Sequence, residues 1–267
     1  MTATVADILA IVEAVAPAQL AEAWDSIGLQ VGSRKWPVKR VLTALDVTPD
    51  VIRDARRRRA DVLVTHHPLF LRPLAALDLD TPLGRMLQTL VAERTALIAA
   101  HTNLDSVEGG VNDILAGTLM LDSVAILQPS PHDARCGLGR IGSLSKPMAL
   151  GDLAAAIKTR MALPDLRFAG DPTLRIHHVA LCSGSGSSLI EAFLGTEAQV
   201  FVTGDVRYHD AREIEAHGRG VIDIGHYASE HVVLEVLARR LADHITERGL
   251  AVAVEVCSSE RAPFQTI

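Results

Sequence analysis

Two adjacent histidines, His66 and His67, follow the apolar stretch DVLVT and are followed at once by Pro68. Neighbouring side chains of a regular strand point to opposite faces of its sheet, so a strand would send these two rings apart. Proline lacks the amide donor that strand pairing needs, and it holds the preceding residue extended. The chain can therefore turn here and bring both imidazoles to one cavity, where they could bind one metal ion or one ion each. Two ordinary hydrogen-bonded histidines are the alternative.

Two further stretches carry residues of metal-binding type. AAHTNLDSVEGGVND contains His101 and Asp105, and DIGHYASEHVV contains His226 and Glu230. His226 and Glu230 are one helical turn apart, which places both side chains on one face of a helix. A carboxylate such as that of Asp105 can bridge two cations. Asp also caps turns, and Glu at this spacing is common on helices, so each pair alone has a structural explanation.

Strand-like and helix-like stretches alternate along the chain, which predicts βαβ units. The fold class is α/β, with two similar lobes of mainly parallel or mixed sheets flanked by helices. Expected strands are 41–47, 61–67, 95–102, 177–184, 198–205, 220–226 and 250–257, and expected helices are 5–17, 49–59, 81–94, 111–121, 151–163, 187–195, 209–218 and 228–245.

The segment 130–150 is rich in Gly, Pro and Ser and is predicted to be a boundary or crossover between lobes 1–128 and 129–267. The histidine and carboxylate stretches all follow predicted strands. Ligands collect at the carboxyl ends of strands in open α/β sheets, so the fold can bring these loops to one pocket.

The composition excludes several classes of protein. Of 267 residues, 48% are hydrophobic and only 3 are cysteines, which is typical of a globular protein without a disulfide framework. The start lacks the basic region of a signal peptide, and no apolar run is long enough to span a bilayer, so we expect a cytoplasmic protein without a membrane partner.

A net charge of -6 and 3% aromatic residues disfavour nucleic-acid binding. The one basic run, Arg56 to Arg59, is either the solvated last turn of a helix or a small nucleic-acid patch. The stretch CSGSGSSL, 182–189, is either a tight turn or a loop whose amides bind an anion. It lacks the P-loop lysine and the full dinucleotide fingerprint.

Six motifs in order resemble one family: WDSIGLQVG, THHPLF, AAHTNLDSVEGGVND, GRIGSL, TGDVRYHDA and GHYASE. The chain resembles type 2 GTP cyclohydrolase I, also called the NIF-three-like dinuclear metal proteins, in the short form without an inserted domain. The resemblance implies a toroidal homohexamer with two divalent metal ions per subunit between the two lobes. It also implies five metal ligands, which fall on His66, His67, Asp105, His226 and Glu230. His101 and His209 match positions that line the family's pocket.

The favoured function is therefore a metal-dependent hydrolase of a nucleotide-like or phosphorylated small molecule, and the family name implies ring opening of GTP. His101 or His209 is the candidate proton shuttle, because imidazole titrates near neutral pH. The alternative is a non-enzymatic metal-binding assembly or regulatory protein. Histidine and carboxylate ligands suit Zn, Fe, Mn, Ni or Co alike.

Overall fold

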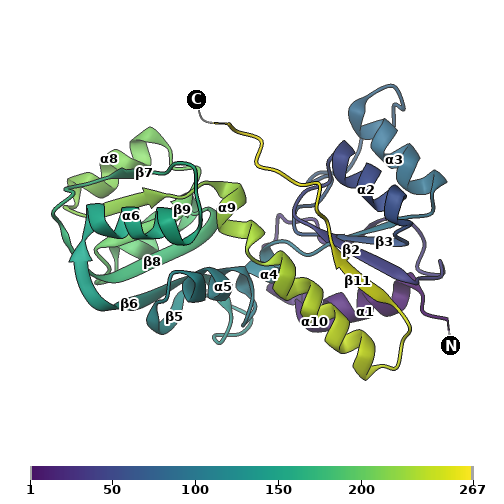
Figure 1. Cartoon of the computed structure of the whole chain (residues 1–267), viewed down its shortest axis with the longest axis horizontal. Helices are drawn as coiled ribbons and strands as arrows, with labels where there is room; N and C mark the ends of the chain where they lie inside the picture. Colours follow the sequence, from purple (N-terminus) through teal and green to yellow (C-terminus); the bar gives the residue numbers. More distant parts are fainter. Residues whose placement is uncertain (1, 266–267) are drawn as a thin grey trace. The chain divides into compact units, whose positions relative to one another are not determined.

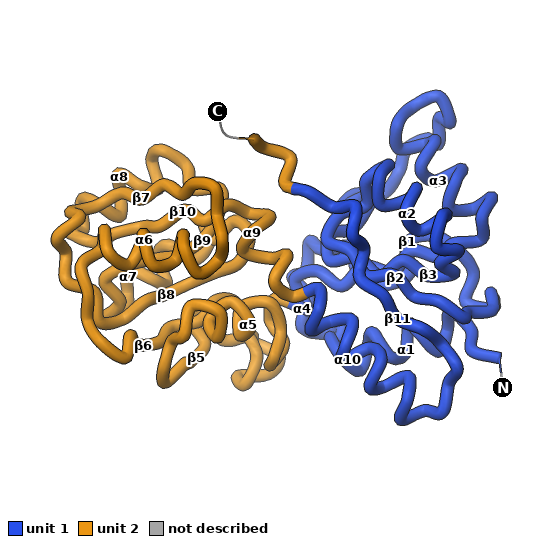
Figure 2. The backbone as a smooth tube through the Cα atoms, in the orientation of Figure 1, with its two compact units in different colours: residues 1–104, 234–261 blue, residues 105–233, 262–267 orange. Residues whose placement is uncertain are grey.

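The computed structural model describes residues 2–265 and divides into two α/β units, shown in two colours in Figure 2. Unit 1 contains Met1–Leu104 and Leu234–Arg261, and unit 2 contains Asp105–Val233 and Ala262–Ile267. This division differs from the consecutive lobes 1–128 and 129–267 expected from the sequence. The chain enters unit 2 early and returns to unit 1 for its last long helix and its last strand.

Unit 1 is built around a five-stranded sheet of order β1-β4-β3-β2-β11. Figure 1 labels β2, β3 and β11 of this sheet. Strands β4, β3, β2 and β11 are parallel, and β1 is antiparallel to β4. Its elements are α1 (Val5–Val15), η1 (Ala18–Leu20), β1 (Gly28–Val31), β2 (Arg40–Ala44), α2 (Pro49–Arg58), β3 (Val62–Thr65), α3 (Pro82–Ala92), β4 (Ala96–Ala99), α10 (Leu234–Glu247) and β11 (Ala253–Val256). Strands β3 and β4 are buried at every position, as expected for parallel strands covered on both faces.

Unit 2 is built around a six-stranded mixed sheet of order β5-β6-β8-β9-β10-β7. The pairs β8–β9 and β9–β10 are parallel, and the other pairs are antiparallel. Helix α4 (Thr102–Ser106) carries the chain from unit 1 into unit 2. The other elements are α5 (Val111–Thr118), β5 (Asp122–Pro129), β6 (Gly137–Ala149), α6 (Leu150–Arg160), β7 (Arg167–Ala169), β8 (Arg175–Ser185), η2 (Ser187–Leu189), α7 (Ile190–Leu194), β9 (Val200–Gly204), α8 (Tyr208–Ala216), β10 (Gly220–Asp223) and α9 (His226–His231).

The predicted α/β class with two mixed sheets flanked by helices is confirmed, but the interpretation of 130–150 as a boundary is wrong. Most of this segment is β6, which pairs antiparallel with β5 and β8 inside the sheet of unit 2. Its glycines allow neighbouring strands to approach β6 closely and do not mark a linker. A Cβ at Gly139, whose φ is +64°, would lie 2.8 Å from the carbonyl oxygen of Leu181 on β8.

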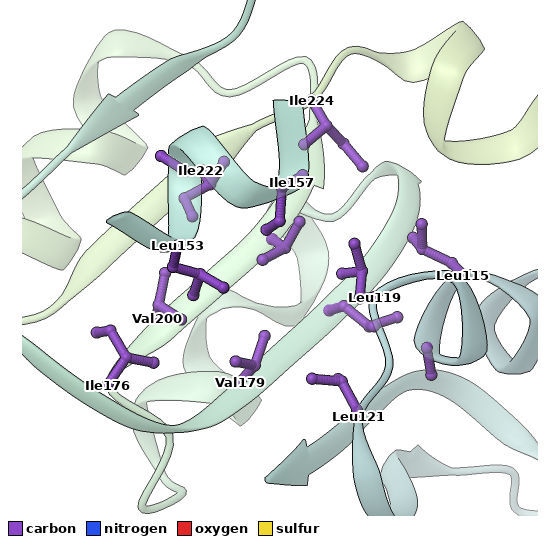
Figure 3. Packing of buried hydrophobic residues seen from close by; sticks show 14 of the residues in the cluster. Leu115, Leu119, Leu121, Leu153, Ile157, Ile176, Val179, Val200, Ile222 and Ile224 are labelled. Carbon is purple, nitrogen blue, oxygen red and sulfur yellow. The ribbon is translucent and has the colours of Figure 1, made fainter. Parts of the chain in front are cut away.

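One apolar layer of the core of unit 2 lies between α5, α6 and the sheet (Figure 3). Leu153 and Ile157 of α6 lie over Val179 and Val200 of the neighbouring strands β8 and β9. Truncating a buried Leu or Ile to alanine costs about 2–5 kcal/mol of folding stability, so this layer holds β8 and β9 in place. Polar residues lie at the ends of these strands.

The predicted helix 228–245 is interrupted and forms α9 and α10. The amide of Val233 donates to the carbonyl of Glu230 at 3.0 Å, a tighter turn than the α-helical pattern. Two β-branched valines, Val232 and Val233, stand at this break, and the chain returns to unit 1 at Leu234. None of the described helices has the length and apolar character needed to cross a bilayer.

The basic run ends α2, which confirms the helical alternative. Arg59 adopts the left-handed conformation that closes the helix. Arg56 pairs with Glu93, and Arg57 and Arg58 pair with Asp54. These arginines therefore form ion pairs inside unit 1, which leaves little support for a nucleic-acid patch.

We expect Asp54→Asn to destabilise the protein by about 1–3 kcal/mol at pH 7, because it removes a buried, charge-assisted acceptor. Burial opposes ionisation of Asp54, but hydrogen bonds from Arg57 and Arg58 outweigh it and hold the pKa of this carboxyl below its usual value. A lowered pKa gives stability that is present above about pH 4 and is lost as the pH falls through the lowered pKa. Urea unfolding measures the free energy of unfolding of wild type and Asp54→Asn at pH 7 and pH 3. The difference between the two proteins should be smaller at pH 3. The control is Asp50→Asn, an exposed ion-pair partner on the same helix, for which we expect less than about 1 kcal/mol.

Cys136, Cys182 and Cys257 are all free and buried, which agrees with the expected absence of a disulfide framework.

Candidate metal centre

The paired histidines stand where β3 ends. The strand stops at Thr65, whose hydroxyl donates to the carbonyl of His67 at 2.8 Å, and the backbone bends at both histidines. Their amides still donate to the carbonyls of Ala44 and Leu45 at the end of β2. The two ring centroids are consequently only 5.0 Å apart, although the residues are adjacent in sequence.

His101, after β4, completes a cluster of three imidazoles in unit 1. Its ring centroid lies 5.2 Å from that of His66 and 5.5 Å from that of His67. One nitrogen from each ring lies within 4.8 Å of one nitrogen of each other ring. Parallel neighbouring strands end at the same edge of a sheet, which is why residues after β3 and β4 meet.

An oxygen acceptor holds Nδ1 of each ring in this cluster. Nδ1 of His66 donates to the carbonyl of Ala100 at 3.0 Å, and Nδ1 of His67 donates to Asp46 at 2.8 Å. Nδ1 of His101 lies 2.8 Å from Oδ1 of Asp25. A carbonyl or carboxylate oxygen can only accept, so Nδ1 carries the proton and Nε2 of the neutral ring carries the lone pair. This arrangement is characteristic of metal-binding histidines.

Asp25 is a buried carboxylate that fixes the position of His101. Burial raises its pKa, but hydrogen bonds from His101 and Thr102 outweigh that effect and bring the pKa to about 2. The contacts from Thr102 come from its amide, at 3.0 Å, and from its hydroxyl. Asp25 is therefore ionised at neutral pH and stabilises a proton on Nδ1 of His101.

A second set of donors lies in unit 2, at the start of α9. Nε2 of His226 faces Oε2 of Glu230 at 3.1 Å, and Nδ1 of His226 donates to Asp205 at 2.7 Å. A separation of about 3 Å suits two ligands on adjacent corners of one coordination sphere, given metal–ligand bonds of about 2.0–2.2 Å. Asp205 has a φ of +54°, a conformation that Asp tolerates better than most residues and that is often found at functional sites.

The last residues of β8 support the two carboxylates of unit 2. The hydroxyl of Ser183 donates to Asp105 at 3.2 Å, and a carboxylate oxygen of Asp105 lies within 4.8 Å of one of Glu230. Gly184, with a φ of +61°, packs directly on Glu230. A Cβ there would lie less than 3.0 Å from Oε1 of Glu230 and 3.3 Å from Nε2 of His226.

The end of β8 and the turn after it decide between the two interpretations of CSGSGSSL. The amides of Ser183, Gly184 and Gly186 donate to side-chain oxygens of Asn112, Ser229 and Thr203. These amides are already used within the unit, so the stretch is a structural turn beneath the carboxylates rather than an anion-binding loop.

The carboxylates also affect Cys182. Burial, with the nearby negative charges of Asp105 and Glu230, strongly raises the pKa of this thiol. The thiol stays protonated, so it is not a thiolate ligand or nucleophile. A concentration of negative charge of this kind favours a bound cation.

The structure thus brings the predicted residues together in two sets: His66, His67 and His101 in unit 1, and Asp105, His226 and Glu230 in unit 2. Imidazole nitrogens and carboxylate oxygens of this kind fit a divalent transition metal. His209 belongs to neither set among the described side chains. It is exposed in the first turn of α8, with its ring centroid 5.3 Å from that of Tyr208.

The sequence interpretation missed the residues that orient the histidines, Asp25, Asp46 and Asp205. Asp46 and Asp205 each follow the carboxyl end of a strand, β2 and β9, as the predicted ligands do. This position after a strand end is the sequence signal by which both residues could have been found. Asp25 lies within the WDSIGLQVG motif but follows no strand.

Comparison with known proteins identifies the family and agrees with this fold. The profile of the Duf34/NIF3 family (NGG1p interacting factor 3) matches residues 3–263. A "GTP cyclohydrolase 1 type 2 homolog" of Clostridium perfringens is 35% identical over 98% of both chains, and one of Streptomyces coelicolor is 37% identical over 97% of this chain and 92% of that protein.

The crystal structure of a Staphylococcus aureus hypothetical protein superposes with a TM-score of 0.94 at 30% identity, and the match covers 100% of both chains. Family profile, relatives and fold all extend over nearly the whole chain, as the resemblance of its motifs predicts. The chain is therefore a member of the Duf34/NIF3 family.

Proposed function

We propose that the chain binds two divalent cations and uses them to hydrolyse a nucleotide-like or phosphorylated small molecule. The proposed ligands are His66, His67, Asp105, His226 and Glu230. The observation that supports this proposal is the common orientation of the histidines: in both units Nδ1 is held by an oxygen acceptor, so that Nε2 presents its lone pair. The two carboxylates supply the negative charge that two cations require.

The bound cations would lower the pKa of water and polarise the group attacked. His101 is the proposed proton shuttle, because it lies beside His66 and His67 but is not among the five ligands. Its Nε2 accepts the proton, while ionised Asp25 at Nδ1 stabilises the imidazolium that forms. His209, exposed at the start of α8, is the second candidate for proton transfer.

The names of the relatives support a substrate class. The relatives bear the name GTP cyclohydrolase 1 type 2 homolog, which supports a purine nucleotide as substrate and ring opening as the reaction to test first. The alternative remains a non-enzymatic role, in which the cations are stored or stabilise the assembly.

Metal analysis of protein purified without chelator, for Zn, Fe, Mn, Ni and Co, followed by a panel of nucleotides and phosphoesters, tests this proposal. We expect about two divalent cations per chain, and hydrolysis of at least one panel member that chelation abolishes and added metal restores. Full metal occupancy without turnover of any panel member, combined with a melting temperature that falls on chelation, would support the non-enzymatic role instead.

We also propose that the protein is a cytoplasmic homohexamer, as the family resemblance implies. Size-exclusion chromatography with light scattering should give a mass six times that of the chain at micromolar concentration. A monomeric mass under these conditions would contradict the hexamer but leave the metal ligands untouched.

A further inference from the structure

A cavity of about 240 Å³ lies in unit 2 beside the start of α8. Helix α8 contacts β7 here, and both elements are labelled in Figure 1. Its walls include Arg167 and Phe168 of β7, Arg207 and Tyr208 at the start of α8, and Asp223 at the end of β10. Arg207 and Tyr208 belong to the TGDVRYHDA motif, and the proposed metal chemistry does not use them. None of the five proposed metal ligands lines this cavity.

Two aromatic rings stand at the cavity with much of their surface exposed. Tyr208 is 72% exposed and Phe168 is 42% exposed, although the chain has few aromatic residues in all. Exposed rings of this kind gain apolar burial when a planar ring, such as a nucleic-acid base, stacks on them.

Two largely exposed guanidinium groups stand beside these rings. One nitrogen of Arg167 donates to Asp223 at 2.5 Å, and two nitrogens of Arg207 donate to Asp210 at 2.9 and 3.0 Å. Each guanidinium has five N–H donors, so each keeps donors for a further acceptor. The carboxylates hold the guanidinium groups in place, and the planar forks suit the oxygens of a phosphate.

The cavity wall is connected to the metal-binding residues of the same unit. Asp223 also accepts from the amides of Val206, at 3.3 Å, and Gly225, at 3.0 Å. Val206 follows Asp205, and Gly225 precedes His226, whose Nδ1 donates to Asp205. A ligand in the cavity would therefore lie against the same loops that position His226.

We propose that this cavity binds a planar heterocycle carrying a single phosphate, as in a nucleoside monophosphate. The ring stacks on Tyr208 and Phe168, and the phosphate accepts from Arg167 and Arg207. The proposal rests on the proposed function only in assigning this ligand to the substrate class of the metal site. Binding itself needs no metal, so it is measured on metal-free protein.

The test is calorimetric titration of chelator-treated protein with guanosine 5′-monophosphate, guanosine and inorganic phosphate. We expect the monophosphate to bind at least 10-fold more tightly than guanosine or inorganic phosphate. Arg207→Gln should remove most of the advantage over guanosine, and Tyr208→Ala should weaken both guanosine compounds. Arg212→Gln is the matched control, because Arg212 is an exposed, ion-paired arginine of the same helix outside the cavity, and it should bind like wild type.

Three results would overturn the proposal: no binding of the monophosphate at millimolar concentration, equal effects of Arg207→Gln and Arg212→Gln, or inorganic phosphate binding as tightly as the monophosphate. Arg167→Gln repeats the test from β7 if Arg207→Gln does not fold. These outcomes are separate from the metal and turnover assays. Metal-dependent hydrolysis without monophosphate binding refutes only the ligand proposed for the cavity. Monophosphate binding without hydrolysis refutes only the enzymatic role.

Discussion

Gly184→Ala is expected to lower the affinity for divalent cations by about 100-fold, the upper end of the range for residues that support metal ligands. The added Cβ would lie less than 3.0 Å from Oε1 of Glu230, so the carboxylate must move away from its position beside His226. Equilibrium dialysis with Zn or Mn measures this change directly. Activity on any substrate should fall with metal occupancy.

The control must separate this contact from backbone strain, since Gly184 has a φ of +61° and alanine there costs about 1–2 kcal/mol. Gly218 has a φ of +68° with nothing within 4 Å of a Cβ, so Gly218→Ala carries the same strain without the contact. The two metal-free variants should melt within a few degrees of each other, and only Gly184→Ala should lose metal. Equal metal affinity in the two variants would show that Glu230 is not a ligand in this position.

Glu230→Gln is expected to reduce hydrolysis by about 100-fold or more, on the scale of a lost electrostatic interaction in the transition state. The change preserves the shape of a nearly buried side chain but replaces an anionic ligand by a neutral amide. In a catalytic site, the fold and the assembly survive this change. If the cations are structural, the free energy of metal binding contributes to folding. Weaker binding in the variant then lowers the melting temperature or dissociates the assembly.

Metal content, melting temperature, oligomer mass and activity should be measured side by side for Glu230→Gln and for Glu191→Gln. Glu191 is an exposed glutamate of α7 in the same unit, and its variant should match wild type in all four measurements. Loss of metal from Glu230→Gln with unchanged hydrolysis would refute the catalytic role of the cations.

Sequence patterns were sufficient for most of the local structure. The strand β2 and the helices α2 and α3 follow from apolar runs, from prolines at helix starts and from caps, as when the hydroxyl of Thr81 accepts from the amide of Gly84. The candidate ligands His66 and His67 were found from their spacing and from Pro68 alone, because a strand end and a proline are local signals.

Other features depend on contacts between residues distant in sequence, which no local pattern contains. Strand β11 pairs in parallel with β2 of unit 1, which lies far from it in sequence, so the consecutive lobes expected from chain order do not appear. Segment 130–150 forms β6 because neighbouring strands supply partners for its backbone and its glycines allow their close approach.

The orientation of the histidines was also decided only by the tertiary structure. Asp25 reaches His101 across 76 residues of chain, and Asp46 and Asp205 each reach their histidine across 21. The sequence determined which residue types could bind a metal. The tertiary structure decided which nitrogen of each ring carries the lone pair, because that depends on an acceptor that folding brings to the other nitrogen.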